Sequence, residues 1–204
     1  MRIALVRHGE TDWNLQGLVQ GTTDIPLNDT GRAQAAEAAE RLALVPWDRV
    51  ITSTLSRANE TGAIIAERLG LPAPETHPGL VERRYGVAEG MLLREYDGAF
   101  PGDTPVGGRE TRDEVAARMV PAVLEIAAAH PGESIVIVSH GGAIRSVLGA
   151  LEPETTFPAI RNLSAHTLRH VDGELELVAF DDRFGAELVE AVVDAETARI
   201  QAAG

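Results

Sequence analysis

The chain contains no lysine and no cysteine, and all 18 of its basic residues are arginine. Without a lysine amine, Schiff-base chemistry and a Walker-type phosphate loop are excluded. Without a thiol, disulfides, thiolate zinc sites and cysteine nucleophiles are excluded as well. Any catalytic chemistry must therefore come from His, Asp, Glu, Ser, Thr and Arg side chains.

The charge balance is acidic. There are 31 Asp and Glu residues against the 18 arginines, a formal net charge of −13, and basic residues gather nowhere densely enough to bind nucleic acid. The apolar run from Ile3 to Val6 is too short for a signal peptide or a membrane span. We therefore expect a cytoplasmic protein with neither a nucleic-acid nor a membrane partner.

The chain length and the pattern of apolar residues predict one domain over residues 1–204 with a mainly parallel sheet. A chain of 204 residues with 44% hydrophobic content can bury one full core. Short apolar runs alternate with segments of helical periodicity, which is typical of the α/β class. We expect strands at 3–6, 49–52 and 134–138 and a hairpin with arms at 163–170 and 175–180. We expect helices at 31–44, 56–69 (capped by Ser56), 110–129 and 143–151, a helical tail at 186–201, and an irregular segment at 72–108.

Three polar clusters directly follow three of the expected strands. They are Arg7-His8-Gly9-Glu10-Thr11, Ser53 to Arg57, and Ser139-His140-Gly141-Gly142. Ligands of open α/β sheets bind outside the carboxyl ends of the strands, so these clusters can form one pocket. Imidazoles, guanidiniums and the free amides of helix N-termini together suit a doubly charged oxyanion. The combination predicts a site for a phosphoryl group.

His8 is the candidate nucleophile of this pocket. A neutral imidazole with one ring nitrogen held as a donor presents the lone pair of the other nitrogen to phosphorus, and no metal is then required. Arg7 and Arg57 are candidates for forked donors to the phosphoryl oxygens, and His140 for charge stabilisation.

A leaving alkoxide also needs a proton. Glu82, in the long polar segment, is the candidate donor and would have to be protonated at the moment of transfer. Glu89 and Glu10 compete with it for this role.

Together these residues resemble the histidine phosphatase superfamily, in its phosphoglycerate mutase-like group. The resemblance extends from Arg2 to about His170. The matching segments, in the order of the family, are Leu5 to Thr11 with Trp13-Asn14, Gln20-Gly21, Asp24, Pro26-Leu27, Gly31, Ser53 to Ala58 with Thr61, Glu82 ahead of Gly86 and Glu89-Gly90, and Val138 to Gly142. The resemblance implies a three-layer α/β/α sandwich and no metal or other cofactor.

The resemblance also implies roles for single residues. It makes the first histidine the phosphorylated nucleophile and the glutamate the proton donor. The residues it implies for the phosphate pocket are Arg7, His8, Arg57 and His140. The residues expected to contact the substrate are Asn14, Gln20, Gly21, Arg83, Tyr85 and Gly141.

The segment from Glu82 to Gly86 looks like that of the mutases, but the length of the chain favours a phosphatase. Only 45 residues separate Gly86 from Gly132, and the resemblance implies a longer insertion there in mutases. A mutase must keep water away from the phosphohistidine, which a shorter covering segment does less well. Arg83, Arg84 and Arg109 are candidates for the distal end of the substrate.

We therefore predict a metal-independent phosphomonoesterase for a small phosphorylated metabolite. A phosphoglycerate mutase and a phosphate-ester binding protein without turnover are the alternatives. A lipase-like hydrolase is disfavoured because G-x-S-x-G is absent, and His77, His130, His166 and His170 lack the spacing of a zinc site. An open sheet edge would allow a homodimer.

Overall fold

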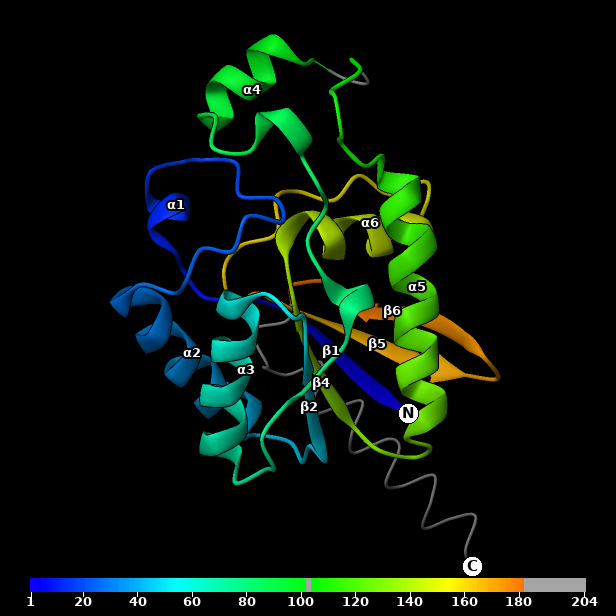
Figure 1. Cartoon of the computed structure of the whole chain (residues 1–204). Helices are drawn as coiled ribbons and strands as arrows, with labels where there is room; N and C mark the ends of the chain where they lie inside the picture. Colours follow the sequence, from blue (N-terminus) through cyan, green and yellow to red (C-terminus); the bar gives the residue numbers. More distant parts are fainter. Residues whose placement is uncertain (102–103, 182–204) are drawn as a thin grey trace, which may run out of the picture.

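A central sheet organises the fold of the computed structural model, which describes residues 1–101 and 104–181 (Figure 1). Within these residues the strands are β1 (Arg2–Arg7), β2 (Arg49–Thr52), β3 (Glu75–Thr76), β4 (Ile135–Ser139), β5 (Ala165–Val171) and β6 (Glu174–Ala179). Their order in the sheet is β3-β2-β4-β1-β5-β6. The first four strands are parallel, whereas β5 is antiparallel to β1 and to β6. The predicted mainly parallel sheet with a hairpin at one side is confirmed.

Helices cover both faces of the sheet, which confirms the α/β class (Figure 1). One core contains residues of α5 (Arg112–Ala129) and α6 (Gly141–Leu151), and the other contains residues of α2 (Asp29–Leu42) and α3 (Ser56–Leu69). Ile3 and Leu5 belong to the first core, and Ala4 and Val6 to the second. This alternation explains the continuous apolar run, since a strand covered on both faces has no solvent side.

Local side-chain signals fix the ends of the long helices. The Asn28 side chain accepts a hydrogen bond from the N–H of Gly31 and begins α2. Thr111 and Glu114 form a capping box at the start of α5. The prediction that Ser56 caps α3 is wrong. Its N–H and its hydroxyl both donate to Asp24 Oδ1. The helix therefore begins at Ser56 without a side-chain cap.

The described residues of the segment 72–108 contain more regular secondary structure than the sequence predicts. It contains β3, the 3-10 helices Pro78–Leu80 and Gly86–Ala88, and the helix α4 (Leu93–Ala99). Tyr96 is the buried residue of α4, so this helix has no apolar stripe long enough to show a helical period. The predicted tail helix 186–201 lies outside the described residues.

The segment with α4 and the segment with the short helix α1 (Asp12–Leu15) lie at the end of the molecule where β1, β2 and β4 finish (Figure 1). They share a small apolar cluster of Val19, Ala88, Tyr96 and Val106, separate from the two main cores. Isolated β-bridges between Leu18 and Leu92 and between Tyr85 and Arg109 add to this packing. The cluster thus holds two loops over the carboxyl ends of the strands. None of the helices in the described part of the chain is long and apolar enough to cross a membrane.

His166 of β5 is fully buried and bonded on both ring nitrogens. Its Nδ1 accepts a hydrogen bond from the N–H of Asp181, and its Nε2 lies 3.2 Å from Ser164 Oγ. Burial lowers the pKa of His166 to about 4, although the nearby Asp181 carboxylate opposes the shift. The imidazole is therefore a neutral link between β5 and the end of β6.

We predict that His166 makes the stability of the fold pH-dependent. An unfolded histidine has a pKa of about 6.5, so below that pH the unfolded chain binds a proton that the folded chain excludes. The contribution of the neutral His166 to the free energy of unfolding should be fully present above pH ~6.5 and should fall by about 1.4 kcal/mol per pH unit toward pH ~4. In urea unfolding, His166→Asn should lose about 2 kcal/mol less than the wild type between about pH 7.5 and pH 5. Identical pH dependence in the two proteins would contradict the prediction, and His170→Asn on the same strand is the control.

Candidate active site

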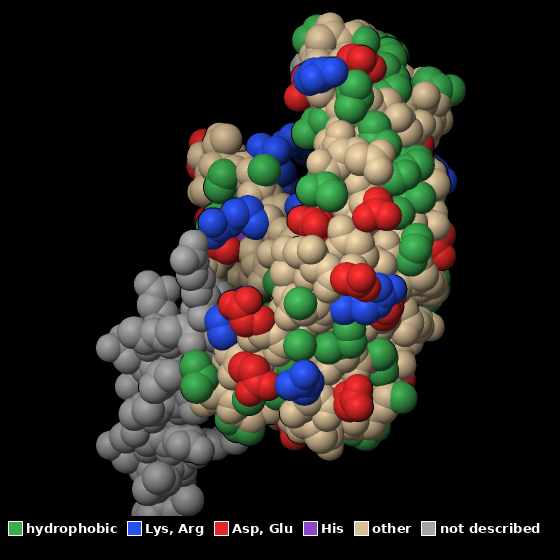
Figure 2. All heavy atoms as spheres, turned by 90° about the vertical axis from the view of Figure 1, so that its left-hand side faces the viewer, with side chains coloured by type: hydrophobic (Ala, Val, Ile, Leu, Met, Phe, Trp, Pro, Cys, Tyr) green, Lys and Arg blue, Asp and Glu red, His purple; other side chains and the backbone are tan. Residues whose placement is uncertain are grey.

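A cavity of about 400 Å³ lies at the carboxyl ends of β1, β2 and β4. Figure 2 shows this cavity as a notch beside the upper part of the molecule, with arginine side chains gathered inside it. The residues named from the sequence that line it are Arg7, His8, Asn14, Gln20, Gly21, Arg57, Glu82, Arg83, Tyr85 and Gly141. The fully buried His140 lies behind His8, with 5.1 Å between the ring centroids. The fold thus brings the three polar clusters together.

His8 is held in one orientation and kept neutral. Its Nδ1 lies 2.7 Å from the carbonyl oxygen of Gly9. A carbonyl only accepts, so Nδ1 carries the hydrogen and Nε2 presents a lone pair. Burial of the ring, which is 2% exposed, and then the charges of Arg7 and Arg57 lower the pKa of His8 well below its ordinary value. The geometry therefore supplies a neutral imidazole with a nucleophilic Nε2.

The two guanidiniums nearest His8 are fixed by backbone carbonyls. Arg57 donates to the carbonyl oxygens of Thr23 and Gly21, at 2.9 and 2.8 Å, while its Nε–H donates to His8 Nε2 at 3.3 Å. Arg7 donates to the carbonyl oxygen of Ile160 at 2.7 Å, and its buried Nε has no hydrogen-bond partner among the described residues. Neutral carbonyls orient these groups without cancelling their charge, so both can act on an anion.

His140 is oriented by Ser53. Its Nε2 lies 2.8 Å from Ser53 Oγ, which already accepts a hydrogen bond from the N–H of Leu55. The serine hydrogen can then be donated to Nε2, which leaves the hydrogen of a neutral His140 on Nδ1. This buried Nδ1 has no partner among the described residues. Burial and then the charge of Arg57 lower the pKa of His140 well below its ordinary value.

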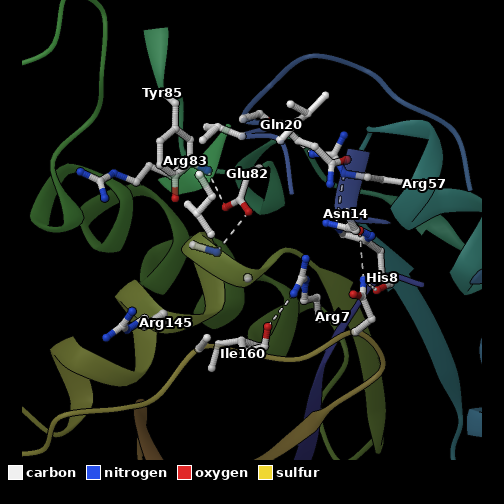
Figure 3. Close-up of a pocket in the computed structure, with 18 of the residues that line it drawn as sticks. Arg7, His8, Asn14, Gln20, Arg57, Glu82, Arg83, Tyr85, Arg145 and Ile160 are labelled. Atoms are coloured by element: carbon white, nitrogen blue, oxygen red, sulfur yellow. Dashed lines mark hydrogen bonds between the residues drawn. The ribbon is translucent and has the colours of Figure 1, made fainter. Parts of the chain in front are cut away.

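Of the three candidate carboxylates, Glu82 is the one that lines the cavity. It is 8% exposed and accepts hydrogen bonds from the N–H groups of Arg83, Gly142 and Ala143. Two of these donors belong to the first turn of α6, which places the carboxyl group over that helix end. A Cβ at position 142 would lie 2.8 Å from Glu82 Oε1, so glycine is needed there for this close approach. Figure 3 shows Glu82 between Arg83 and Arg7.

Glu89 and Glu10 do not line the cavity and accept hydrogen bonds from structural groups. Glu89 accepts hydrogen bonds from Thr22, Thr23 and the N–H of Tyr85, which ties two loops together. Burial acts to raise the pKa of Glu89, but these hydrogen bonds outweigh it and lower the pKa below its ordinary value. Glu10 accepts from Asn28.

The polar side chains around the rest of the cavity are partly committed. Asn14 Oδ1 accepts from Thr11 and from Asn162, whose Nδ2 also donates to the carbonyl oxygen of His8. Gln20 is 8% exposed, and its Oε1 accepts from none of the described residues. Burial raises the pKa of the Tyr85 hydroxyl to about 12, so it remains a donor.

Two of the three arginines expected at the distal end of the substrate do not line the cavity. Arg109 donates to the Tyr96 hydroxyl and to the carbonyl oxygen of Thr104 and so stabilises the α4 segment. Arg84 is exposed and lies 3.8 Å from Glu110. Arg83 does line the cavity, with its Nε bonded to the carbonyl oxygen of Glu110.

Sequence reasoning missed two other arginines of the cavity wall. Arg112 is the first residue of α5, and Arg145 lies one helical turn after Gly141 in α6. The spacing of four residues from Gly141 was the available signal for Arg145, because it places both on one helix face. Arg112 carried no comparable signal.

The described residues include no group of three or more His, Asp or Glu side chains arranged to hold a metal ion.

Comparison with known proteins agrees with this geometry. A sequence model of the histidine phosphatase superfamily (branch 1) matches residues 3–183. The chain is 45% identical over 146 residues to the uncharacterized phosphatase PhoE of Bacillus subtilis, covering 72% of this chain and 75% of the relative. It is 38% identical over 186 residues to phosphoglycerate mutase-like protein 4 of Arabidopsis thaliana, covering 84% and 80%. A solved mycobacterial glucosyl-3-phosphoglycerate phosphatase in complex with VO3 has 30% identity and a TM-score of 0.77, covering 88% of this chain and 98% of that one.

Proposed function

The chain belongs to branch 1 of the histidine phosphatase superfamily, and on that premise we propose that it hydrolyses a small phosphorylated metabolite through a phosphohistidine on His8. The observation that carries the proposal is the unprotonated Nε2 of the neutral His8 ring, which lies beside Arg57 and faces the same cavity as Glu82. The proposed nucleophile, cationic groups and proton donor therefore line one cavity.

In the first step, His8 Nε2 attacks phosphorus, and the bond from phosphorus to the ester oxygen breaks. Glu82 acts as the general acid in this step and gives a proton to the leaving oxygen. Arg57 and Arg7 donate to the equatorial oxygens, and His140 Nδ1 adds a further donor. The products are a free alcohol and phosphorylated His8.

In the second step, water attacks the same phosphorus. The Glu82 carboxylate takes a proton from the water, the bond from phosphorus to Nε2 breaks, and inorganic phosphate leaves. His8 returns to its neutral form and Glu82 is protonated again. The two steps use only side chains of the chain and water.

The cytoplasmic location, the extension of the domain over residues 1–204 and the homodimer stay predictions.

His8→Ala should abolish turnover and leave the fold intact, since the variant has no group that can accept the phosphoryl group. We expect kcat on 4-nitrophenyl phosphate to fall by about 10³-fold or more. Wild type quenched in base during turnover of a ³²P-labelled ester should carry label, and the variant should carry none. His130→Ala, at the end of α5, is the matched control. Full activity of His8→Ala would refute the mechanism.

Glu82→Gln should separate substrates by their leaving groups. An alkyl phosphate needs a proton on its leaving oxygen, so kcat on it should fall by about 10²- to 10⁴-fold. 4-Nitrophenyl phosphate releases a stable anion and should lose much less. Equal losses on the two substrates would assign the acid role to another group.

Hydrolysis and phosphoryl transfer to a second substrate position give different products. With 3-phosphoglycerate and a trace of 2,3-bisphosphoglycerate, we expect inorganic phosphate and glycerate, because water completes the second step. Phosphorus NMR distinguishes inorganic phosphate from 2-phosphoglycerate in one sample. Accumulation of 2-phosphoglycerate without free phosphate would identify a mutase instead.

A further inference from the structure

Two arginines of the cavity wall have no counter-charge in the described part of the chain. Arg112 and Arg145 make no hydrogen bond and no ion pair with the described residues. Arg49, which is partly buried like Arg145, is by contrast paired with Glu75 and Glu133. The two cavity arginines lack such a carboxylate partner among the described residues.

Asp113, the neighbour of Arg112 in the sequence, is exposed and does not line the cavity, and Glu110, two residues before Arg112, is already committed elsewhere. Glu110 accepts hydrogen bonds from Arg118 and from the N–H of Arg84. Arg83 is likewise tied to the backbone carbonyl of Glu110, and its guanidinium stacks over the Tyr85 ring at 5.3 Å. These contacts leave Arg112 and Arg145 as the cations of this wall that are free to receive a ligand.

The two guanidiniums are close enough to influence each other. Burial and then the charge of Arg112 lower the pKa of Arg145, against the opposing effect of Tyr85. Like charges held near one another without a counter-ion are unfavourable, and an anion between them removes the repulsion. Arg112 begins α5 and Arg145 lies near the start of α6, so the N-terminal ends of both helices add positive potential.

The position of Arg145 corresponds to the leaving-group side of the reaction. Figure 3 shows Arg145 and Arg83 on the far side of Glu82 and Arg7 from His8. The phosphoryl group belongs between His8 and Arg57, and the leaving oxygen belongs at Glu82. The remainder of a substrate therefore extends from Glu82 toward Arg145.

We propose that Arg145, together with Arg112, binds a second anionic group on the leaving-group side of the substrate. The inference rests on the proposed function and extends it to a substrate class. The preferred substrates are small phosphomonoesters that carry a carboxylate or a second phosphate. Arg145 and Arg112 thereby determine specificity, while Arg7 and Arg57 bind the phosphoryl group that is transferred.

Pairs of substrates that differ only in the second anion test this proposal. 3-Phosphoglycerate and glycerol 3-phosphate differ by a carboxylate in place of a hydroxymethyl group. Propane-1,3-diol bisphosphate and the monophosphate differ by a second phosphate. The kcat/KM values of wild type, Arg145→Gln and Arg112→Gln are compared on each pair. Arg94→Gln is the matched control, because Arg94 is an exposed arginine of α4 outside this cavity and has no ion pair with the described residues.

We expect wild type to prefer the member with the second anionic group in at least one pair, and the pair concerned identifies that group as carboxylate or phosphate. Arg145→Gln should lower kcat/KM on that member by about 10- to 100-fold and change the other member by about twofold or less. Arg112→Gln should act in the same direction but less strongly, because Arg112 is more exposed.

The absence of a wild-type preference in both pairs would overturn the subsite, as would equal losses on both members of a pair in Arg145→Gln. Activity on 4-nitrophenyl phosphate separates this failure from that of the proposed function. Wild type that hydrolyses this ester but shows no such preference refutes only the subsite. Wild type that hydrolyses no ester at all refutes the proposed function, and the subsite with it.

Discussion

The hydrogen bonds from Arg57 to the carbonyl oxygens of Gly21 and Thr23 are the contacts on which the site depends. They hold a buried guanidinium in place without a carboxylate, so its charge remains available. A buried cation is expensive unless its donors are satisfied, and here the loop 20–23 satisfies them. That loop is held in turn by Glu89, through Thr22 and Thr23. The Glu89 carboxylate thus binds the loop that binds Arg57 and forms no hydrogen bond with the guanidinium itself.

The same arrangement sets the protonation of the two histidines. Arg57 donates to His8 Nε2, and burial together with the arginine charges favours the neutral imidazole. A protonated His8 would have no lone pair at Nε2 and could not attack phosphorus. In the proposed mechanism, the charges that attract the phosphoryl group therefore also keep His8 in the form that can attack phosphorus. His140 is buried under the same charges, with its orientation set by Ser53.

The absence of lysine has a structural counterpart in this cavity. One guanidinium donates to two carbonyls and still directs its Nε–H at His8. The planar fork of arginine makes this division possible, whereas an ammonium group presents its donors from a single atom. At the opposite wall, Arg112 and Arg145 lack described partners, so the cavity has positive charge at both ends with Glu82 between them.

The sequence by itself determined the longer strands, the long helices of the described residues, and the residues that the three polar clusters bring to the cavity. Apolar runs such as Ile3 to Val6 mark strands covered on both faces, and a polar cluster after such a strand must lie at the ligand-binding edge of the sheet. Only the tertiary structure placed Glu82 in the cavity and Glu89 outside it, turned Arg109 toward Tyr96, and brought Arg112 and Arg145 to one wall. The physical reason is that periodicity and capping are local properties of the chain. The availability of a charged group depends on partners far away in sequence, as the bonds from Thr22 and Thr23 to Glu89 show.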